Sequence, residues 1–142
     1  MRINEKKQIF GEYEYLTGYC DFENYWGEEL VEVELTHFVS GLIDQSEVYG
    51  TSKIIYSVPD KTKITDAFVF RYAVGPWDRY DYWTIKIHTK SGKMYQSKRR
   101  FYCSLGEQDD GRVILGVNGD AKTFYVAFPV SSGCNTELNE IN

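Results

Sequence analysis

The sequence predicts an all-β protein, an antiparallel β-sandwich of about eight to ten strands in one domain over residues 1–142. Apolar and polar residues alternate along several short segments, the pattern of strands with one buried face. Turn residues such as Ser91-Gly92 and Asn118-Gly119 separate these segments at intervals of about ten residues. A hydrophobic fraction of 42% supplies enough apolar side chains for a core.

In the first half of the chain, the alternation is most regular in VEVELTHFV, residues 31–39. Its valines and Leu35 share one face, and its glutamates and Thr36 take the other. In AFVFRYA, residues 67–73, the aromatic side chains share one face. Strands are also expected at 9–16 and 52–58.

In the second half, YWTIKIH (82–88) places Trp83, Ile85 and Ile87 on one face. The opposite face carries Tyr82 and Lys86, with Thr84 and His88. The segment 97–106, SKRRFYCSLG, is expected to form a helix of one or two turns. It is one of at most two short helices, near 97–105. The other expected strands lie at 94–96, 112–117 and 123–128.

The charge of the chain is unevenly distributed. The net charge is −5, and residues 1–47 hold eleven acidic side chains against three basic ones. Residues 82–106 contain no acidic side chain but six basic ones. Such asymmetry gives surfaces of opposite sign, and the basic one suits an anionic partner. The overall acidity argues against nucleic acid as that partner.

Several functional classes are not expected. No run approaches the roughly 18 apolar residues of a membrane helix, and the start lacks the apolar region of a secretory signal. A cytoplasmic protein, or one secreted without a visible signal, is therefore expected. Three cysteines and two histidines at no metal-like spacing predict no metal site and no cofactor. Free thiols are the first interpretation, and one disulfide remains open. Without a catalytic motif such as GxSxG or HExxH, no enzyme is expected.

An aromatic-rich stretch, GPWDRYDYWTIKIHTK, spans residues 75–90. Strand parity directs Trp83 into the core. Trp77 and Tyr80 precede the strand, where the chain turns after Gly75-Pro76, so both rings are expected to be at least partly exposed. Rings with a polar tip suit sugar faces, lipid head groups and the membrane interface.

This stretch and its surroundings resemble the head-group-binding segment of the actinoporins, the sea-anemone cytolysins. Pro76 matches a proline that opens an aromatic-rich loop, and Tyr82-Trp83 matches a double aromatic that leads into a strand. The resemblance covers about residues 31–133 and extends to the fungal fruit-body lectins, which share the sandwich and bind N-acetylated sugars. It departs at the N-terminus, where the amphipathic pore-forming segment of actinoporins has no counterpart.

The resemblance implies a non-enzymatic binding module for a phospholipid head group or a glycan, with a membrane surface as a further partner and cytolysin-like activity as an open question. Rings at Trp77, Tyr80 and Tyr82 would line the pocket, and Lys86 or Arg100 would contact an anionic group. The remaining pocket residues that it implies are Ser57, Pro76, Tyr95, Phe101 and Tyr102.

A second hypothesis is a small acidic inhibitor of another protein, such as an immunity protein or an antagonist of a host factor. In the N-terminal third, acidic residues surround five aromatic ones, and tyrosine and tryptophan are favoured interface anchors. Acidic side chains would attract a basic protein partner. The oligomeric state, including a homo-oligomer, remains open. The rings of this region are Tyr13, Tyr15, Tyr19, Tyr25 and Trp26.

Overall fold

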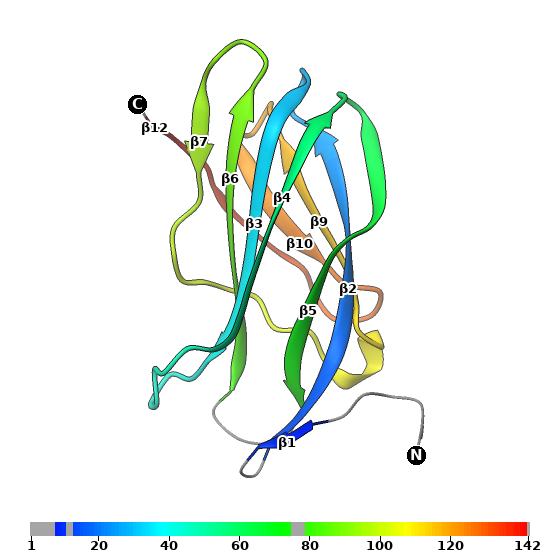
Figure 1. The fold of residues 1–142 in the computed structure, drawn as a ribbon, viewed down its shortest axis with the longest axis vertical. Helices are drawn as coiled ribbons and strands as arrows, with labels where there is room; N and C mark the ends of the chain where they lie inside the picture. The colour runs from blue at the N-terminus through cyan, green and yellow to red at the C-terminus, as the bar shows by residue number, and fades with distance from the viewer. Residues whose placement is uncertain (1–7, 11–12, 75–78, 142) are drawn as a thin grey trace.

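In the part of the chain that the structure describes, two six-stranded β-sheets pack face to face, which confirms the predicted sandwich (Figure 1). The structure is a computed structural model and describes residues 8–10, 13–74 and 79–141. Among these residues, all strand pairings are antiparallel except that of β2 with β9, which is parallel. None of the helices in the described part of the chain is long and apolar enough to cross a membrane.

The first sheet is organised around the long strand β2, which pairs with β5 on one side and with β9 and β1 on the other. On the far side of β9, the sheet continues with β10 and then with β11 at its edge. The strands of this sheet are β1 (Gln8–Phe10), β2 (Tyr13–Tyr25), β5 (Thr62–Val74), β9 (Arg112–Asn118), β10 (Thr123–Ala127) and β11 (Cys134–Glu137).

The second sheet has the order β12-β7-β6-β3-β4, and the two-residue strand β8 adds to β6. Strand β3 lies between β4 and β6 and carries the predicted 31–39 segment. The strands of this sheet are β3 (Leu30–Ser40), β4 (Val48–Val58), β6 (Tyr80–Thr89), β7 (Met94–Gln96), β8 (Phe101–Tyr102) and β12 (Asn139–Ile141).

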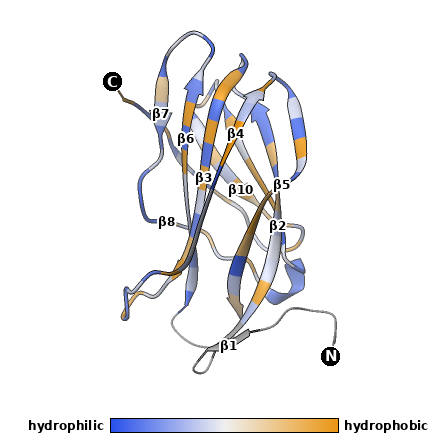
Figure 2. Ribbon diagram, in the orientation of Figure 1, coloured by the Kyte–Doolittle hydropathy of each residue, from blue (hydrophilic) through white to orange (hydrophobic). Residues whose placement is uncertain are grey.

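The core lies between the sheets and follows the predicted alternation. On β6, Trp83, Ile85 and Ile87 are buried, whereas Thr84 and Lys86 are only half-buried on the opposite face. Figure 2 shows the same pattern as alternating orange and blue along β3 and β6. The largest fully buried side chains include Trp83, Phe22, Phe68, Phe70 and Phe124.

The helix predicted over residues 97–106 is wrong. Among the described residues, the one helical turn is the 3₁₀ turn at Glu107–Asp109. Phe101, Cys103 and Leu105 are buried while Tyr102 is exposed, which is the two-residue period of an extended chain. The segment therefore pairs with β6 as β8 and continues extended, because strand pairing buries every second side chain in the core.

A disulfide bond links Cys103, just after β8, to Cys134 at the start of β11. The first interpretation of three free thiols is therefore wrong for two of them, and the disulfide left open by the sequence is present. Cys20 is free and fully buried, and burial raises the pKa of its thiol well above the usual value. The disulfide thus connects the second sheet to the edge of the first.

We expect alkylation of the unfolded, unreduced protein to modify one cysteine per chain, and all three after reduction. Replacing Cys103 and Cys134 together by alanine should lower the free energy of unfolding by about 2–4 kcal/mol, because the crosslink constrains the unfolded chain. Mass spectrometry and denaturant titration measure the two effects. Three modified thiols without reductant would contradict the pairing.

Asp109 stabilises the connection that runs from β8 of the second sheet to β9 of the first sheet. Its buried carboxylate accepts hydrogen bonds from the backbone N–H groups of Gly106 (2.7 Å), Val130 (2.9 Å) and Ser131 (2.8 Å). Burial alone would raise the pKa of Asp109, but the hydrogen bonds from Ser131, Gly106 and Val130 outweigh it and hold the pKa below its ordinary value.

Because its pKa is lower in the folded state, Asp109 stabilises the fold above its unfolded-state pKa, and this stabilisation is lost as pH falls through the folded-state value. Asp109→Asn should therefore destabilise the protein near neutral pH and give a smaller loss of stability below about pH 4. Thermal unfolding across this range measures both. Parallel curves for wild type and variant would contradict the assignment.

Candidate functional site

An aromatic cluster lies on the face of the second sheet that points away from the core. It is built on Phe38 of β3 and Tyr82 of β6, which are paired residues. Their rings stack with centroids 5.4 Å apart and planes 9° apart. The Arg100 guanidinium lies 4.4 Å from the centroid of the Tyr82 ring, within cation–π range. Two rings and a cation thus lie together on this outer face.

Tyr80 and Tyr102 extend the cluster toward solvent. Tyr102 pairs with Tyr82, and its ring contacts Tyr80 edge-on at 5.5 Å and Tyr82 at 5.9 Å. Tyr102 is 50% exposed and Tyr80 half-buried, whereas Tyr82 is only 2% exposed. Tyr82 lies on the face opposite Trp83, as strand parity predicts, but the ring is not accessible to line a pocket, because Phe38, Arg100 and Tyr102 cover it. Tyr80 and Tyr102 are the rings that a ligand can reach.

The two arginines of the segment are used differently. Arg100 donates to Ser40 Oγ (3.3 Å) and to the carbonyl oxygen of Gly41 (3.2 Å) and pairs with no described carboxylate. Arg99 forms an ion pair with Glu47, with both carboxylate oxygens within 2.8 Å, and its guanidinium lies 5.4 Å from the Phe38 ring centroid. The guanidinium of Arg100 is therefore oriented by hydrogen bonds, and none of the described carboxylates neutralises its charge.

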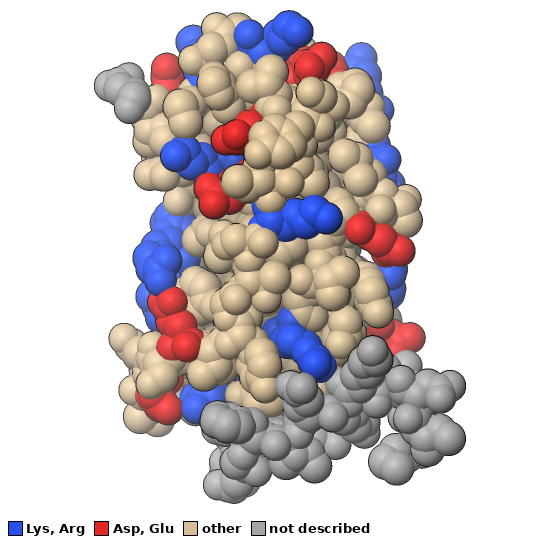
Figure 3. Space-filling view, in the orientation of Figure 1, with Lys and Arg blue, Asp and Glu red and all other residues tan. Residues whose placement is uncertain are grey.

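A groove of about 410 Å³ adjoins the aromatic cluster, and we call it the basic groove. Lys86 and Lys98 line it, and neither ammonium group pairs with a carboxylate of a described residue. Glu34 is the one acidic side chain in the lining. In the view of Figure 3, basic side chains lie along both edges and across the visible face, with acidic side chains among them. Thr36, Thr84, Gln96, Ser97 and Arg99 complete the polar lining.

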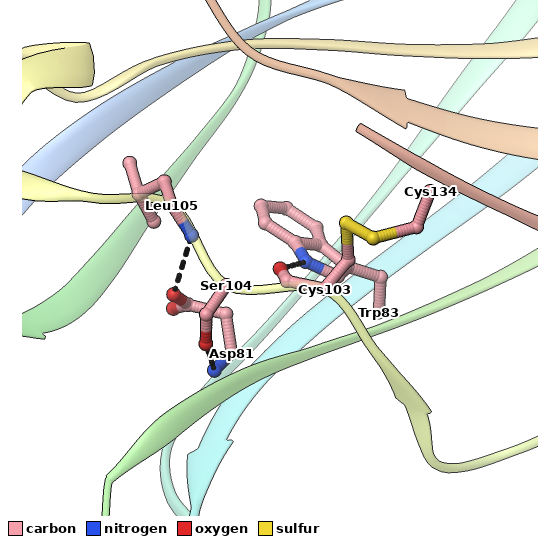
Figure 4. The surroundings of a disulfide bond; sticks show 6 residues. All are labelled: Asp81, Trp83, Cys103, Ser104, Leu105 and Cys134. Atoms are coloured by element: carbon pink, nitrogen blue, oxygen red, sulfur yellow. Dashed lines mark hydrogen bonds between the residues drawn. A yellow bond between two sulfur atoms is a disulfide. The ribbon is translucent and has the colours of Figure 1, made fainter. Parts of the chain in front are cut away.

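Asp81 holds the segment that carries Arg100 and Tyr102 in place (Figure 4). Its backbone carbonyl accepts from the Cys103 N–H (3.1 Å), and its carboxylate accepts from the Leu105 N–H (3.4 Å). Its own N–H donates to Ser104 Oγ (2.8 Å). The other carboxylate oxygen lies 2.7 Å from His37 Nε2, in a buried hydrogen bond.

Trp83 and the disulfide complete this attachment. The Trp83 indole N–H donates to the Cys103 carbonyl oxygen over 2.7 Å, and Cys103 is bonded to Cys134 (Figure 4). Strand β6 and the segment after β8 are therefore joined by side-chain, backbone and covalent links. This fixes the rings and charges on the neighbouring outer face relative to one another.

The other predicted site residues lie elsewhere. Ser57 is near the far end of β4, roughly 25–30 Å from Tyr80 along the strands. Tyr95 and Phe101 are buried in the core, where their rings contact Trp26 (4.8 Å) and Phe124 (5.8 Å). Pro76 and Trp77 lie outside the described residues. Tyr80, Tyr82, Lys86, Arg100 and Tyr102 are brought to one face.

Sequence reasoning missed Phe38. It lies on the polar face of the 31–39 segment, in phase with Glu34 and Thr36, and this aromatic residue at a polar position was the available signal. His37 offers little for catalysis, since it is fully buried between the rings of Phe70 and Trp83. Within the described ranges, no group of three or more His, Cys, Asp or Glu side chains could hold a metal ion.

Tyr82 provides a test of the cluster, because its hydroxyl is buried and has no hydrogen-bond partner among the described residues. Tyr82→Phe should leave the free energy of unfolding unchanged or raise it by up to about 1 kcal/mol, since the uncompensated hydroxyl is removed. Tyr82→Ala should lower it by about 3–5 kcal/mol, since a buried ring is lost. Urea unfolding measures both variants.

The matched control is Tyr125→Phe, which removes a hydroxyl that donates to Glu23 over 2.7 Å. Burial and the Glu23 carboxylate raise the pKa of Tyr125, and loss of this bond should lower the free energy of unfolding by about 1–3 kcal/mol. A loss of similar size in Tyr82→Phe would mean that the Tyr82 hydroxyl is bonded after all.

The sequence was compared with protein-family models and with curated proteins. No protein-family model matches the chain, and none of the curated proteins matches it. Its function is therefore inferred from the geometry of its own residues.

Proposed function

We propose that the protein is a non-enzymatic binding module whose aromatic cluster and basic groove bind a lipid head group or a glycan that carries a negative charge. One observation carries this proposal: accessible rings at Tyr80 and Tyr102 adjoin the Arg100 guanidinium and a groove lined by Lys86 and Lys98. None of these three cations pairs with a carboxylate of the described residues.

Each part of the surface suits one part of such a ligand. The faces and edges of Tyr80 and Tyr102 offer contact to a sugar ring or to the apolar portion of a head group, and their hydroxyls offer hydrogen bonds. Lys86 and Lys98 offer charge-assisted hydrogen bonds to a phosphate, sulfate or carboxylate. Because the chain as a whole is acidic, an anion would be attracted to this face rather than to the whole molecule.

A feature beside the cluster supports the lipid form of the proposal. The loop between β3 and β4 exposes Leu42 (65%) and Ile43 (90%), and its Asp44 forms an ion pair with Arg79 (3.1 Å). Two exposed aliphatic side chains beside a basic surface suit contact with an anionic bilayer. Whether such contact leads to lysis, which the resemblance to actinoporins leaves open, is a separate question that dye release from vesicles answers.

The protein-inhibitor alternative has less support from the geometry. Tyr15 and Trp26 are buried, so they offer little to a partner. Asp21 is engaged by Lys63 and Arg112. Tyr19 and Tyr25 remain exposed, and they keep this alternative open as the second candidate.

The proposal predicts that Lys86→Gln combined with Lys98→Gln weakens binding about tenfold or more, because charge-assisted hydrogen bonds contribute about 1.5–3 kcal/mol each. The probes are phosphatidylcholine vesicles with and without phosphatidylserine, and an array of sulfated, sialylated and neutral glycans. Tyr102→Ala should weaken the same binding, since it removes the most exposed ring of the cluster.

The control is Lys53→Gln combined with Lys90→Gln, which removes two exposed lysines outside the groove and changes the net charge equally. It should bind like wild type. Equal weakening in both double variants would show unspecific attraction, and failure of wild type to bind any anionic probe would reject the proposal.

A further inference from the structure

A second pocket, of about 370 Å³, lies at the opposite end of the sandwich from Tyr80. Strand β6 begins at Tyr80 beside Ser40 and ends at Thr89 beside Leu30, just after the loop from β2 to β3 that borders this pocket. The pocket is formed by that loop and by the β4–β5 and β9–β10 loops, at the upper end of the view in Figure 1. We call it the loop-end pocket.

Asn24 joins the first two loops. Its side chain is fully buried, and its amide nitrogen lies within 3.1 Å of the carbonyl oxygens of Glu28, Val58 and Pro59. Its backbone carbonyl accepts from the Lys61 N–H over 2.7 Å. One buried residue at the end of β2 thus holds both loops and sets the spacing of the pocket walls.

The third loop is held by a close approach of backbone to backbone. The Gly119 N–H donates to the Tyr25 carbonyl oxygen (3.0 Å), and a Cβ at position 119 would collide with the carbonyl oxygen of Trp26. Asp60 accepts from the Gly27 N–H (3.0 Å) across the first two loops. The walls are therefore connected through hydrogen bonds between loops, as a preformed binding site requires.

The side chains that line the pocket offer groups that the fold does not use. The Tyr25 ring is 51% exposed, since Tyr25 follows the buried Asn24 on β2 and points to the opposite face. The Asp120 carboxylate and the Lys61 ammonium have no hydrogen bond or ion pair with a described residue. The Asn118 amide nitrogen is likewise uncommitted, since its side chain contributes only the oxygen, which accepts from two backbone N–H groups. A ring, acceptors and donors thus face one pocket.

We propose that the loop-end pocket binds an uncharged sugar. Sugar hydroxyls both donate and accept, so they can satisfy the carboxylates of Asp60 and Asp120 together with the Lys61 ammonium and the Asn118 amide. The face of Tyr25 can cover the apolar face of the sugar ring. The two carboxylates would repel an anion, and the Lys61 ammonium would repel a cation. This site is separate in position and chemistry from the basic groove and stands without it.

The test uses the full chain, an array of neutral oligosaccharides, and saturation-transfer-difference NMR with glucose, galactose, mannose and N-acetylglucosamine. Wild type should bind at least one of these probes. Tyr25→Ala and Asp120→Asn should each weaken that binding about tenfold or more, with an unchanged melting temperature, since both side chains are exposed.

The matched controls are Tyr56→Ala, which removes an exposed tyrosine (64%) of β4, and Glu140→Gln, which neutralises an exposed acid of β12. Both should bind the neutral probe like wild type, as should the Lys86→Gln, Lys98→Gln variant. Absence of neutral binding by wild type, binding unaffected by Tyr25→Ala, or equal loss in Tyr56→Ala would each overturn the proposal. The anionic probes report on the basic groove alone. A failure of the proposed function would therefore appear with those probes and not with the neutral sugars.

Discussion

The arrangement of this protein's outer surface depends on one buried carboxylate, that of Asp81. It accepts hydrogen bonds from the ring of His37 on β3 and from the Leu105 N–H of the segment after β8, and its backbone pairs with Cys103 and Ser104. A buried carboxylate is stable only when its oxygens are occupied in this way. Because these contacts fix the start of β6 against residues 103–105, the preceding residues Arg100 and Tyr102 lie over Tyr82.

The aromatic cluster and the loop-end pocket lie toward opposite ends of the sandwich and differ in their chemistry. Near the start of β6, Tyr80 and Tyr102 combine with cations that pair with no carboxylate of the described residues, which suits a ligand with a negative group. Beyond the other end, Tyr25 combines with groups of both signs, which suits an uncharged polar ligand. In both places the exposed ring is positioned by a buried polar side chain, Asp81 in one and Asn24 in the other.

The alternation of side chains predicted the sandwich well, because burial on one face of a strand is a local property of the sequence. It placed Trp83 in the core and Lys86 outside. It could not show that Tyr82 is covered, since the covering residues come from β3 and β8, nor that Cys103 pairs with Cys134, since connectivity depends on the folded path. The helix prediction failed because the alternating burial of Phe101, Cys103 and Leu105 becomes evident only once β6 lies beside them.

The central claim is that Asp81 holds residues 101–105 in place and so preforms the binding surface. Amide hydrogen exchange in Asp81→Asn tests this directly, because the variant keeps one oxygen for His37 and replaces the other acceptor by an NH₂ group. Exchange at the Cys103 and Leu105 amides should become about tenfold faster or more, while amides of β3 and β9 keep their rates. Wild-type exchange rates at Cys103 and Leu105 in this variant would contradict the claim.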